Sequence, residues 1–164
     1  MRTRYIYFET DEEQWRWDFG VYLLIIYYAN ELNKEKAKAL LATTLSEFDF
    51  RLSNGLPTED IDTEDNTCHF DLNNLELAIN FIDAELISAL NNEPVGLLTK
   101  YGGERKFLEL FDLTTDISAT IGVSYGEEEF LKGDVGYCSH IVTLYREFLQ
   151  KALDSNKPYE VYVY

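Results

Sequence analysis

Apolar residues recur at helical spacing along residues 11–32, where two interleaved sets cover most of the circumference of one helix. The first set is Trp15, Phe19, Tyr22, Ile26 and Ala29, and the second is Trp17, Val21, Leu24, Tyr28 and Leu32. Thr10 and Glu13 have the spacing of a capping box, so this helix is predicted to begin near Asp11 and to lie in the middle of the fold. A buried strand at residues 21–28 is the alternative, because that run is rich in β-branched and aromatic residues.

The same periodicity predicts three further helices. One spans residues 34–52 and ends before Gly55. The next begins with Asp71 as its N-cap and runs to residue 90, with an outer face of acidic and amide side chains. Its apolar stripe consists of Leu72, Leu75, Ile79, Ile82, Leu86 and Leu90. The last helix spans residues 138–153.

Residues 106–111 and 117–125 are predicted to form a β-hairpin. Apolar residues alternate with small polar residues along 117–125, which is typical of a strand with one buried face. Residues 3–8 and 158–164 also have the composition of strands. The expected fold is α+β: a predominantly helical single domain, residues 1–164, with about four helices. Its small antiparallel sheet contains the 106–125 hairpin and can also include the N- and C-terminal strands.

Composition favours a folded cytoplasmic domain. The chain has 164 residues, of which 46% are hydrophobic and 15% aromatic, enough for one core. The longest apolar run, residues 21–29, is about half of the roughly 20 residues that a membrane helix requires. Residues 1–9 do not have the pattern of a secretory signal, because Glu9 follows a single short apolar patch.

Charge is unevenly distributed along the chain, whose formal net charge is -16. No lysine or arginine lies between Arg51 and Lys100, although this stretch carries ten carboxylates, and none lies between Lys106 and Lys132. A field of this sign attracts cationic surfaces and repels nucleic acid phosphates and anionic lipid. Solubility alone is the alternative explanation, but a chain selected only for solubility would more often mix both signs. The pattern therefore predicts a basic protein partner, and neither nucleic acid nor membrane.

Chemical motifs are weak. Cys68, His69, Cys138 and His140 have the residue types of a zinc site, but adjacent side chains such as 68 and 69 diverge. The acidic tract from Asp60 to Asp71 has the carboxylate rhythm of a calcium loop, but Asp65 stands where that loop requires glycine. We therefore expect no catalytic residue, no metal site and no cofactor.

An acidic cytosolic domain with no catalytic signature resembles the bacterial immunity proteins, which neutralise nuclease toxins. The resemblance is carried by the gap from Arg51 to Lys100, by residues 59–65 and by residues 127–129. It implies an inhibitor, not an enzyme, that occludes a cationic nuclease with carboxylates and aromatic side chains. The expected partner-binding residues are Glu59, Asp60, Asp62, Glu64, Asp65, Phe70, Glu76, Asp83, Tyr125, Glu127, Glu128 and Glu129.

Three alternatives stay open. A phage-type mimic of nucleic acid that inhibits a host defence nuclease would have the same electrostatics and a different partner. A regulatory adaptor could use residues 159–164 to pair with the edge of another sheet. A small enzyme would have to use Cys138 or His140. The pattern of residues does not indicate an oligomeric state.

Overall fold

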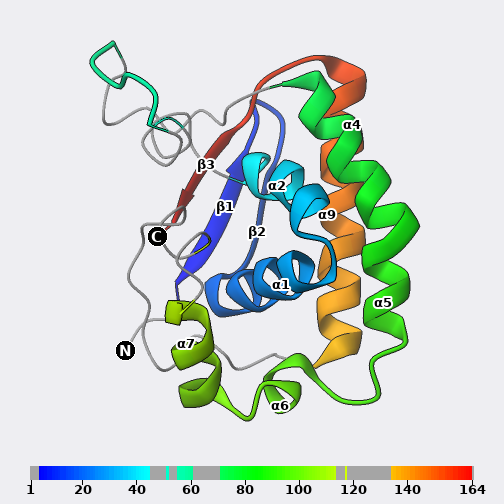
Figure 1. The fold of residues 1–164 in the computed structure, drawn as a ribbon. Helices are drawn as coiled ribbons and strands as arrows, with labels where there is room; N and C mark the ends of the chain where they lie inside the picture. The colour runs from blue at the N-terminus through cyan, green and yellow to red at the C-terminus, as the bar shows by residue number, and fades with distance from the viewer. Residues whose placement is uncertain are drawn as a thin grey trace.

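Helices pack to one side of a small sheet in the computed structural model, which describes residues 4–44, 51, 55–60, 71–113, 117 and 134–163 (Figure 1). The fold is α+β and predominantly helical, as predicted. The elements are, in chain order, β1 (Tyr5–Glu9), β2 (Gln14–Asp18), α1 (Phe19–Leu32), α2 (Lys34–Ala42), α4 (Leu72–Phe81), the π-helix η1 (Ile82–Leu86), α5 (Ile87–Asn91), α6 (Leu97–Lys100), α7 (Glu104–Leu113), α9 (Val135–Ser155) and β3 (Glu160–Val163).

A β-hairpin occupies the place where the first turns of the central helix were predicted. Strands β1 and β2 pair antiparallel from Tyr5 opposite Asp18 to Glu9 opposite Gln14. The helix begins at Phe19, so the predicted start near Asp11 is wrong. Trp15 and Trp17 are two residues apart on β2, and both rings lie against Phe8 of β1, an arrangement that a strand provides and a helix does not.

Helix α1 runs through the middle of the molecule (Figure 1). All of its residues from 19 to 29 are buried, which explains why apolar residues cover its whole circumference. Tyr27 near its C-terminal end meets Tyr101 and Phe107 edge to face, with ring centroids 5.1 and 5.4 Å apart. The helix predicted for residues 21–28 is confirmed, and the strand alternative is excluded.

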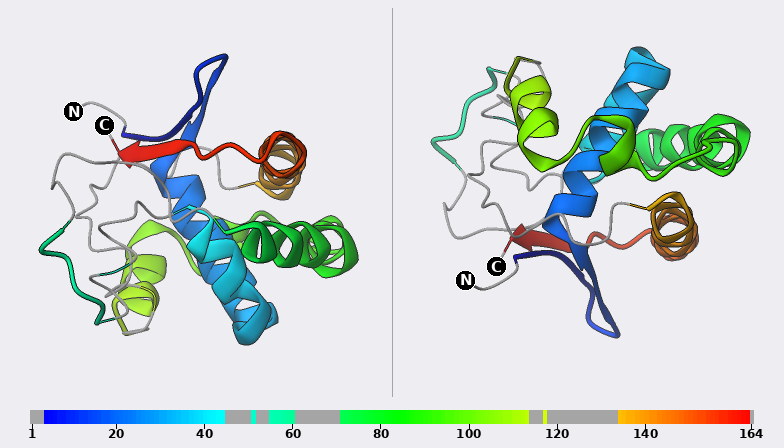
Figure 2. Two further views of the ribbon diagram at one scale, coloured as in Figure 1. Left: turned by 90° about the horizontal axis from the view of Figure 1, so that it is seen from above. Right: turned by 90° about the horizontal axis from the view of Figure 1, so that it is seen from below.

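The sheet has the strand order β2-β1-β3 in the described part of the chain. Strand β3 pairs antiparallel with β1 and brings Val161 opposite Phe8, so the predicted N- and C-terminal strands are confirmed. Phe8 is completely buried, and its ring lies 5.0 Å from that of Tyr145 and 5.7 Å from that of Phe148, both on α9. Helices α1 and α2 lie to one side of the strands (Figure 2).

The helix predicted after Asp71 is confirmed. The Asp71 carboxylate accepts the backbone N–H groups of Asn73 at 2.8 Å and Asn74 at 3.4 Å, as an N-cap does. Helix α4 continues through η1 into α5, so residues 72–91 form one rod with a single π-helical turn. Helix α9 contains the predicted residues 138–153 and is longer at both ends. The predicted helix 34–52 is confirmed over α2 but not as one continuous helix, because α2 ends at Ala42 and residues 43–44 form a turn. Arg51 is helical, and residues 45–50 and 52 lie outside the described part.

The predicted strand at residues 106–111 is wrong, because these residues belong to helix α7. Phe107 and Phe111 are one helical turn apart, and both are buried against Tyr27 of α1. This contact with a distant element favours the helical spacing over the alternation that the segment also contains. Of the predicted partner strand 117–125, only Ile117 is described, and it is helical; the other residues lie outside the described part.

None of the helices in the described ranges combines the length and the apolar character that a membrane crossing requires.

Candidate partner-binding groove

The acidic residues predicted to bind a partner do not form one surface where the structure describes them. Glu59 and Asp60 belong to the segment 55–60, whereas Glu76 lies on α4 and Asp83 on η1. The views in Figures 1 and 2 agree that the segment 55–60 and the rod α4–α5 lie on opposite sides of the molecule. The other predicted residues lie outside the described part: Asp62, Glu64, Asp65, Phe70, Tyr125, Glu127, Glu128 and Glu129.

Two of these carboxylates already have cationic partners within the protein. Arg146 of α9 donates from Nε and Nη2 to both oxygens of Asp83, at 2.9–3.2 Å. Arg51 Nη1 donates to Asp60 Oδ1 at 2.9 Å. Glu59 and Glu76 are exposed and form no ion pair with a described residue. Half of the described candidates are therefore neutralised within the fold.

Internal pairing of this kind uses most of the basic side chains that the structure describes. Seven lysines and arginines in these ranges lie within 4.0 Å of a carboxylate: Lys36, Lys38, Arg51, Lys100, Lys106, Arg146 and Lys151. Arg4 and Arg16 lie over aromatic rings, with Arg16 4.2 Å from the ring centroid of Tyr5. Since acids outnumber bases by 30 to 14, carboxylates remain that no cation neutralises.

A groove of about 720 Å³ lies where the β1–β2 turn approaches the C-terminal end of α9. Residues 9–13 form one wall, α9 contributes Phe148, Lys151, Ala152 and Ser155, and residues 157–160 complete the lining. We call this space the hairpin groove. Five carboxylates and two lysines line it, an excess of three negative charges.

Thr10 fixes the wall that carries the acids. Its Oγ1 accepts the backbone N–H of Glu13 at 3.0 Å and that of Glu12 at 3.3 Å, while its own N–H donates to the carbonyl of Glu13 at 2.9 Å. The side-chain bond expected of a capping box is thus present, but it closes a turn between two strands. These bonds hold Asp11, Glu12 and Glu13 at the tip of the hairpin.

The lining of the groove includes apolar surface. Phe148, Ala152 and Tyr159 are each at most 5% exposed, so only small parts of them meet solvent. The rings of Phe148 and Tyr159 meet edge to face at 5.0 Å, and the Tyr159 hydroxyl donates to the carbonyl of Thr43 at the C-terminal end of α2. These contacts make the lining a rigid part of the core.

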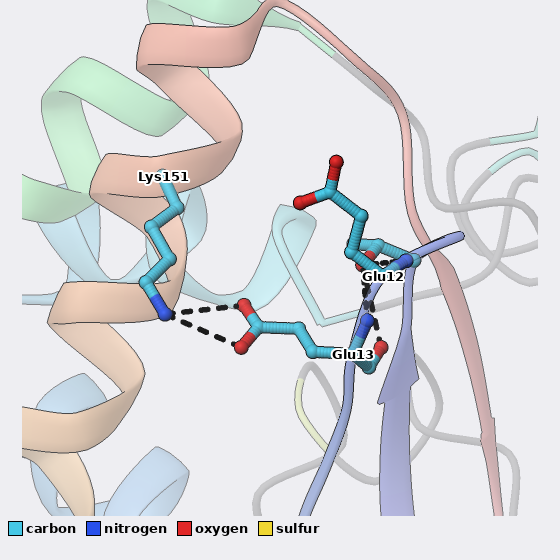
Figure 3. A network of polar contacts seen from close by, with 4 residues as sticks. Glu12, Glu13 and Lys151 are labelled. Carbon is cyan, nitrogen blue, oxygen red and sulfur yellow. Dashed lines mark hydrogen bonds and ion pairs between the residues drawn. The ribbon is translucent and has the colours of Figure 1, made fainter.

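The carboxylates of the groove differ in what they bind. Glu9 accepts hydrogen bonds from the Tyr162 hydroxyl at 2.9 Å and from Gln14 Nε2 at 3.3 Å. Glu13 reaches across to Lys151, whose Nζ lies 3.2 and 3.4 Å from its two oxygens, whereas no hydrogen bond or ion pair joins the Glu12 carboxylate to that lysine (Figure 3). Among the described residues, no ion pair or side-chain hydrogen bond is formed by the carboxylates of Asp11, Glu12 and Glu160, and all three are exposed.

Sequence reasoning missed this groove because residues 11–13 were assigned to a helix and residues 159–164 to a possible edge. A signal was nevertheless present: an acidic Thr-Asp-Glu-Glu turn lies between two short runs rich in tyrosine and tryptophan. The proximity of that turn to Lys151 and Glu160 depends on pairing across the whole length of the chain.

The alternative of a thiol enzyme receives no support from the geometry. Cys138 is fully buried, and burial, together with the charge of Asp134, raises the pKa of its thiol to about 12. His140 is exposed on the same helix. Within the described ranges, no three acidic, histidine or cysteine side chains gather as a metal site requires; Cys68, His69 and residues 61–65 lie outside them.

The chain was compared with protein-family models, with curated proteins and with solved structures, and none of the three comparisons found a match.

Proposed function

We propose that this protein is an acidic binding inhibitor of a cationic protein, and that its partner is a nuclease toxin, as for the immunity proteins. The observation that carries the proposal is the distribution of charge in space. Described cations are largely bound to the protein's own carboxylates or aromatic rings, whereas the carboxylates of Asp11, Glu12 and Glu160 face solvent without a cation. A partner with a cationic surface would neutralise these carboxylates, whereas a partner that carries phosphates would be repelled by them.

The mechanism would be occlusion. A nuclease holds phosphates in a cationic site, and carboxylates placed in that site would neutralise it and block the substrate. Long-range attraction between the two surfaces would raise the association rate, and salt would lower it. Binding would occur in the cytoplasm, where such a toxin reaches its nucleic acid substrate.

A pull-down with a salt gradient tests the proposal. The tagged protein is incubated with a lysate of its source organism at low salt, and bound proteins are eluted by rising salt and identified by mass spectrometry. An unrelated acidic protein of similar net charge is the control bait. We expect one basic nuclease to elute late from the wild-type bait only, and an equimolar amount of this protein to stop its activity. Recovery of only those cationic proteins that also bind the control would contradict the proposal.

A further inference from the structure

The hairpin groove combines an apolar lining with an acidic rim, which is the environment that a lysine or arginine side chain prefers. Such side chains lay their apolar stems along apolar surface and keep the charged group at the edge. Here the exposed ring of Pro158 would contact the stem, together with the small parts of Phe148 and Tyr159 that meet solvent. Glu12 and Glu160 would face the charged group. None of the described residues that the sequence predicted to bind a partner, Glu59, Asp60, Glu76 and Asp83, lines this groove.

Lys151 already occupies one side of this arrangement. Its ammonium group bonds both oxygens of Glu13, and the two side chains are 69% and 40% exposed (Figure 3). An ion pair so open to water contributes little to stability, so a cation from outside can replace Lys151 at small cost. The pair shows that the geometry of Glu13 suits an ammonium group.

We propose that the hairpin groove takes a lysine or arginine side chain of the cationic partner, and that Lys151 competes with this side chain for Glu13. The inference rests on the proposed function and names the chemistry of its contact. Charge complementarity supports the choice of occupant, because the five carboxylates around the groove exceed its two lysines. Asp60 and Asp83, by contrast, are each bonded to an arginine of the same chain.

Fluorescein-labelled hexa-arginine is the probe, and its affinity is measured by fluorescence anisotropy at low salt with hexa-glutamate as the negative control. Glu12→Gln/Glu160→Gln removes two carboxylates from the groove. Glu35→Gln/Glu104→Gln removes two carboxylates from the first turns of α2 and α7, outside the groove, and is therefore matched in net charge. We expect about a tenfold loss of affinity from the groove variant and less than about a twofold loss from the other.

Lys151→Met tests the competition. It frees Glu13, so we expect it to raise the affinity for hexa-arginine about threefold. Lys106→Met is the matched control, because Lys106 forms a similarly exposed pair with Glu109 on α7 and its loss changes the net charge equally. Thermal unfolding of each variant shows that it is folded.

The outcomes separate the two proposals. Equal losses of affinity from the two double variants, or equal gains from the two lysine variants, would overturn the groove as the binding site. Either result would leave the proposal of a cationic partner unaffected. No binding of hexa-arginine to the wild-type protein beyond that of hexa-glutamate would overturn the partner class itself.

Discussion

Tyrosine hydroxyl groups donate hydrogen bonds to carboxylates of other elements at four places in the described part of the chain. The pairs are Tyr28 with Glu93, Tyr101 with Glu31, Tyr137 with Asp18, and Tyr162 with Glu9, at 2.9–3.4 Å. Such a bond stabilises an ionised carboxylate through a neutral donor. Glu93 also pairs with Lys100 at 3.2 Å, whereas no described residue forms an ion pair with Glu31, Asp18 or Glu9. The chain has 14 basic and 30 acidic residues, so lysine and arginine are too few to pair with every carboxylate, and tyrosine provides further hydrogen-bond donors.

Tyr137→Phe tests one of these pairs. Burial and the negative charge of Asp18 raise the pKa of Tyr137 to about 12 from the usual value near 10. A raised folded-state pKa means that the stabilisation is present below pH 10 and is lost as the pH rises toward 12. We expect the variant to lower the free energy of unfolding by about 1 kcal/mol at neutral pH.

Urea unfolding of both proteins at about pH 8 and about pH 11 measures the effect. The difference in unfolding free energy should narrow at the higher pH, since the wild type loses the bond and the variant never had it. The other tyrosines are common to both proteins, so their titration cancels. A difference that does not change with pH would show that the Asp18 bond is not its source.

At the scale of elements, the sequence predicts those helices whose ends and faces are encoded locally. Asp71 predicted the start of α4 correctly. The apolar stripe that follows it is buried as predicted except at Leu72, which lies in the first turn and is 40% exposed. Thr10 and Glu13 predicted a correct hydrogen bond but the wrong element, since a turn and a helix start share that bond. Contacts of Trp15 and Trp17 with Phe8 decide between them, and these contacts exist only once β1 and β2 have paired.

Contacts between distant segments also explain why the strand predicted at residues 106–111 is wrong. Residues 106–111 contain both an alternating pattern and a helical pair, Phe107 and Phe111. Packing of that pair against Tyr27 selects the helix, and no local signal in the sequence carries this contact. The hairpin groove is harder still to predict from the sequence, because its lining comes from opposite ends of the chain: residues 9–13, 148–155 and 157–160.

Asp71→Ala tests the local encoding of α4. The substitution removes the acceptor of two backbone N–H groups, so we expect the free energy of unfolding to fall by about 1 kcal/mol. Asp71→Asn keeps an acceptor oxygen and loses only the favourable charge at the helix N-terminus, so its effect should be smaller. Urea unfolding of the three proteins under one condition makes the comparison. Equal losses from Ala and Asn would assign the effect to charge and not to the cap.

At the scale of the whole molecule, a sequence window without lysine or arginine is not a region without cations in space. The window between Arg51 and Lys100 contains Asp83 and Glu85, yet Arg146 reaches Asp83 from α9 and Lys36 reaches Glu85 from α2. The hydrogen bond from Lys36 lowers the pKa of Glu85, as an approaching cation does. Counting charge along the chain therefore gives the sign of the molecule, but it does not show which carboxylates lie next to a cation in space.

The net charge itself leads to a prediction about salt. With a formal charge of -16, repulsion among carboxylates opposes the compact state, and salt screens repulsion over distances longer than about 10 Å at 0.1 M. Salt also weakens the exposed ion pairs, such as Lys38 with Glu35, but each of these contributes at most about 1 kcal/mol. We expect the melting temperature to rise by several degrees between about 0.01 M and about 0.3 M sodium chloride.

Differential scanning calorimetry at pH 7 measures this shift. Sodium chloride is the appropriate salt, because sulfate stabilises folded proteins by exclusion from their surface whatever their charge. Lys106→Met and Glu104→Gln serve as a matched pair, since both lie on α7 and change the net charge by one in opposite directions. The rise should be steeper for Lys106→Met and shallower for Glu104→Gln, because screening acts on the excess charge. A melting temperature that falls with salt in all three proteins would mean that internal ion pairs, and not repulsion between carboxylates, dominate the electrostatics of this fold.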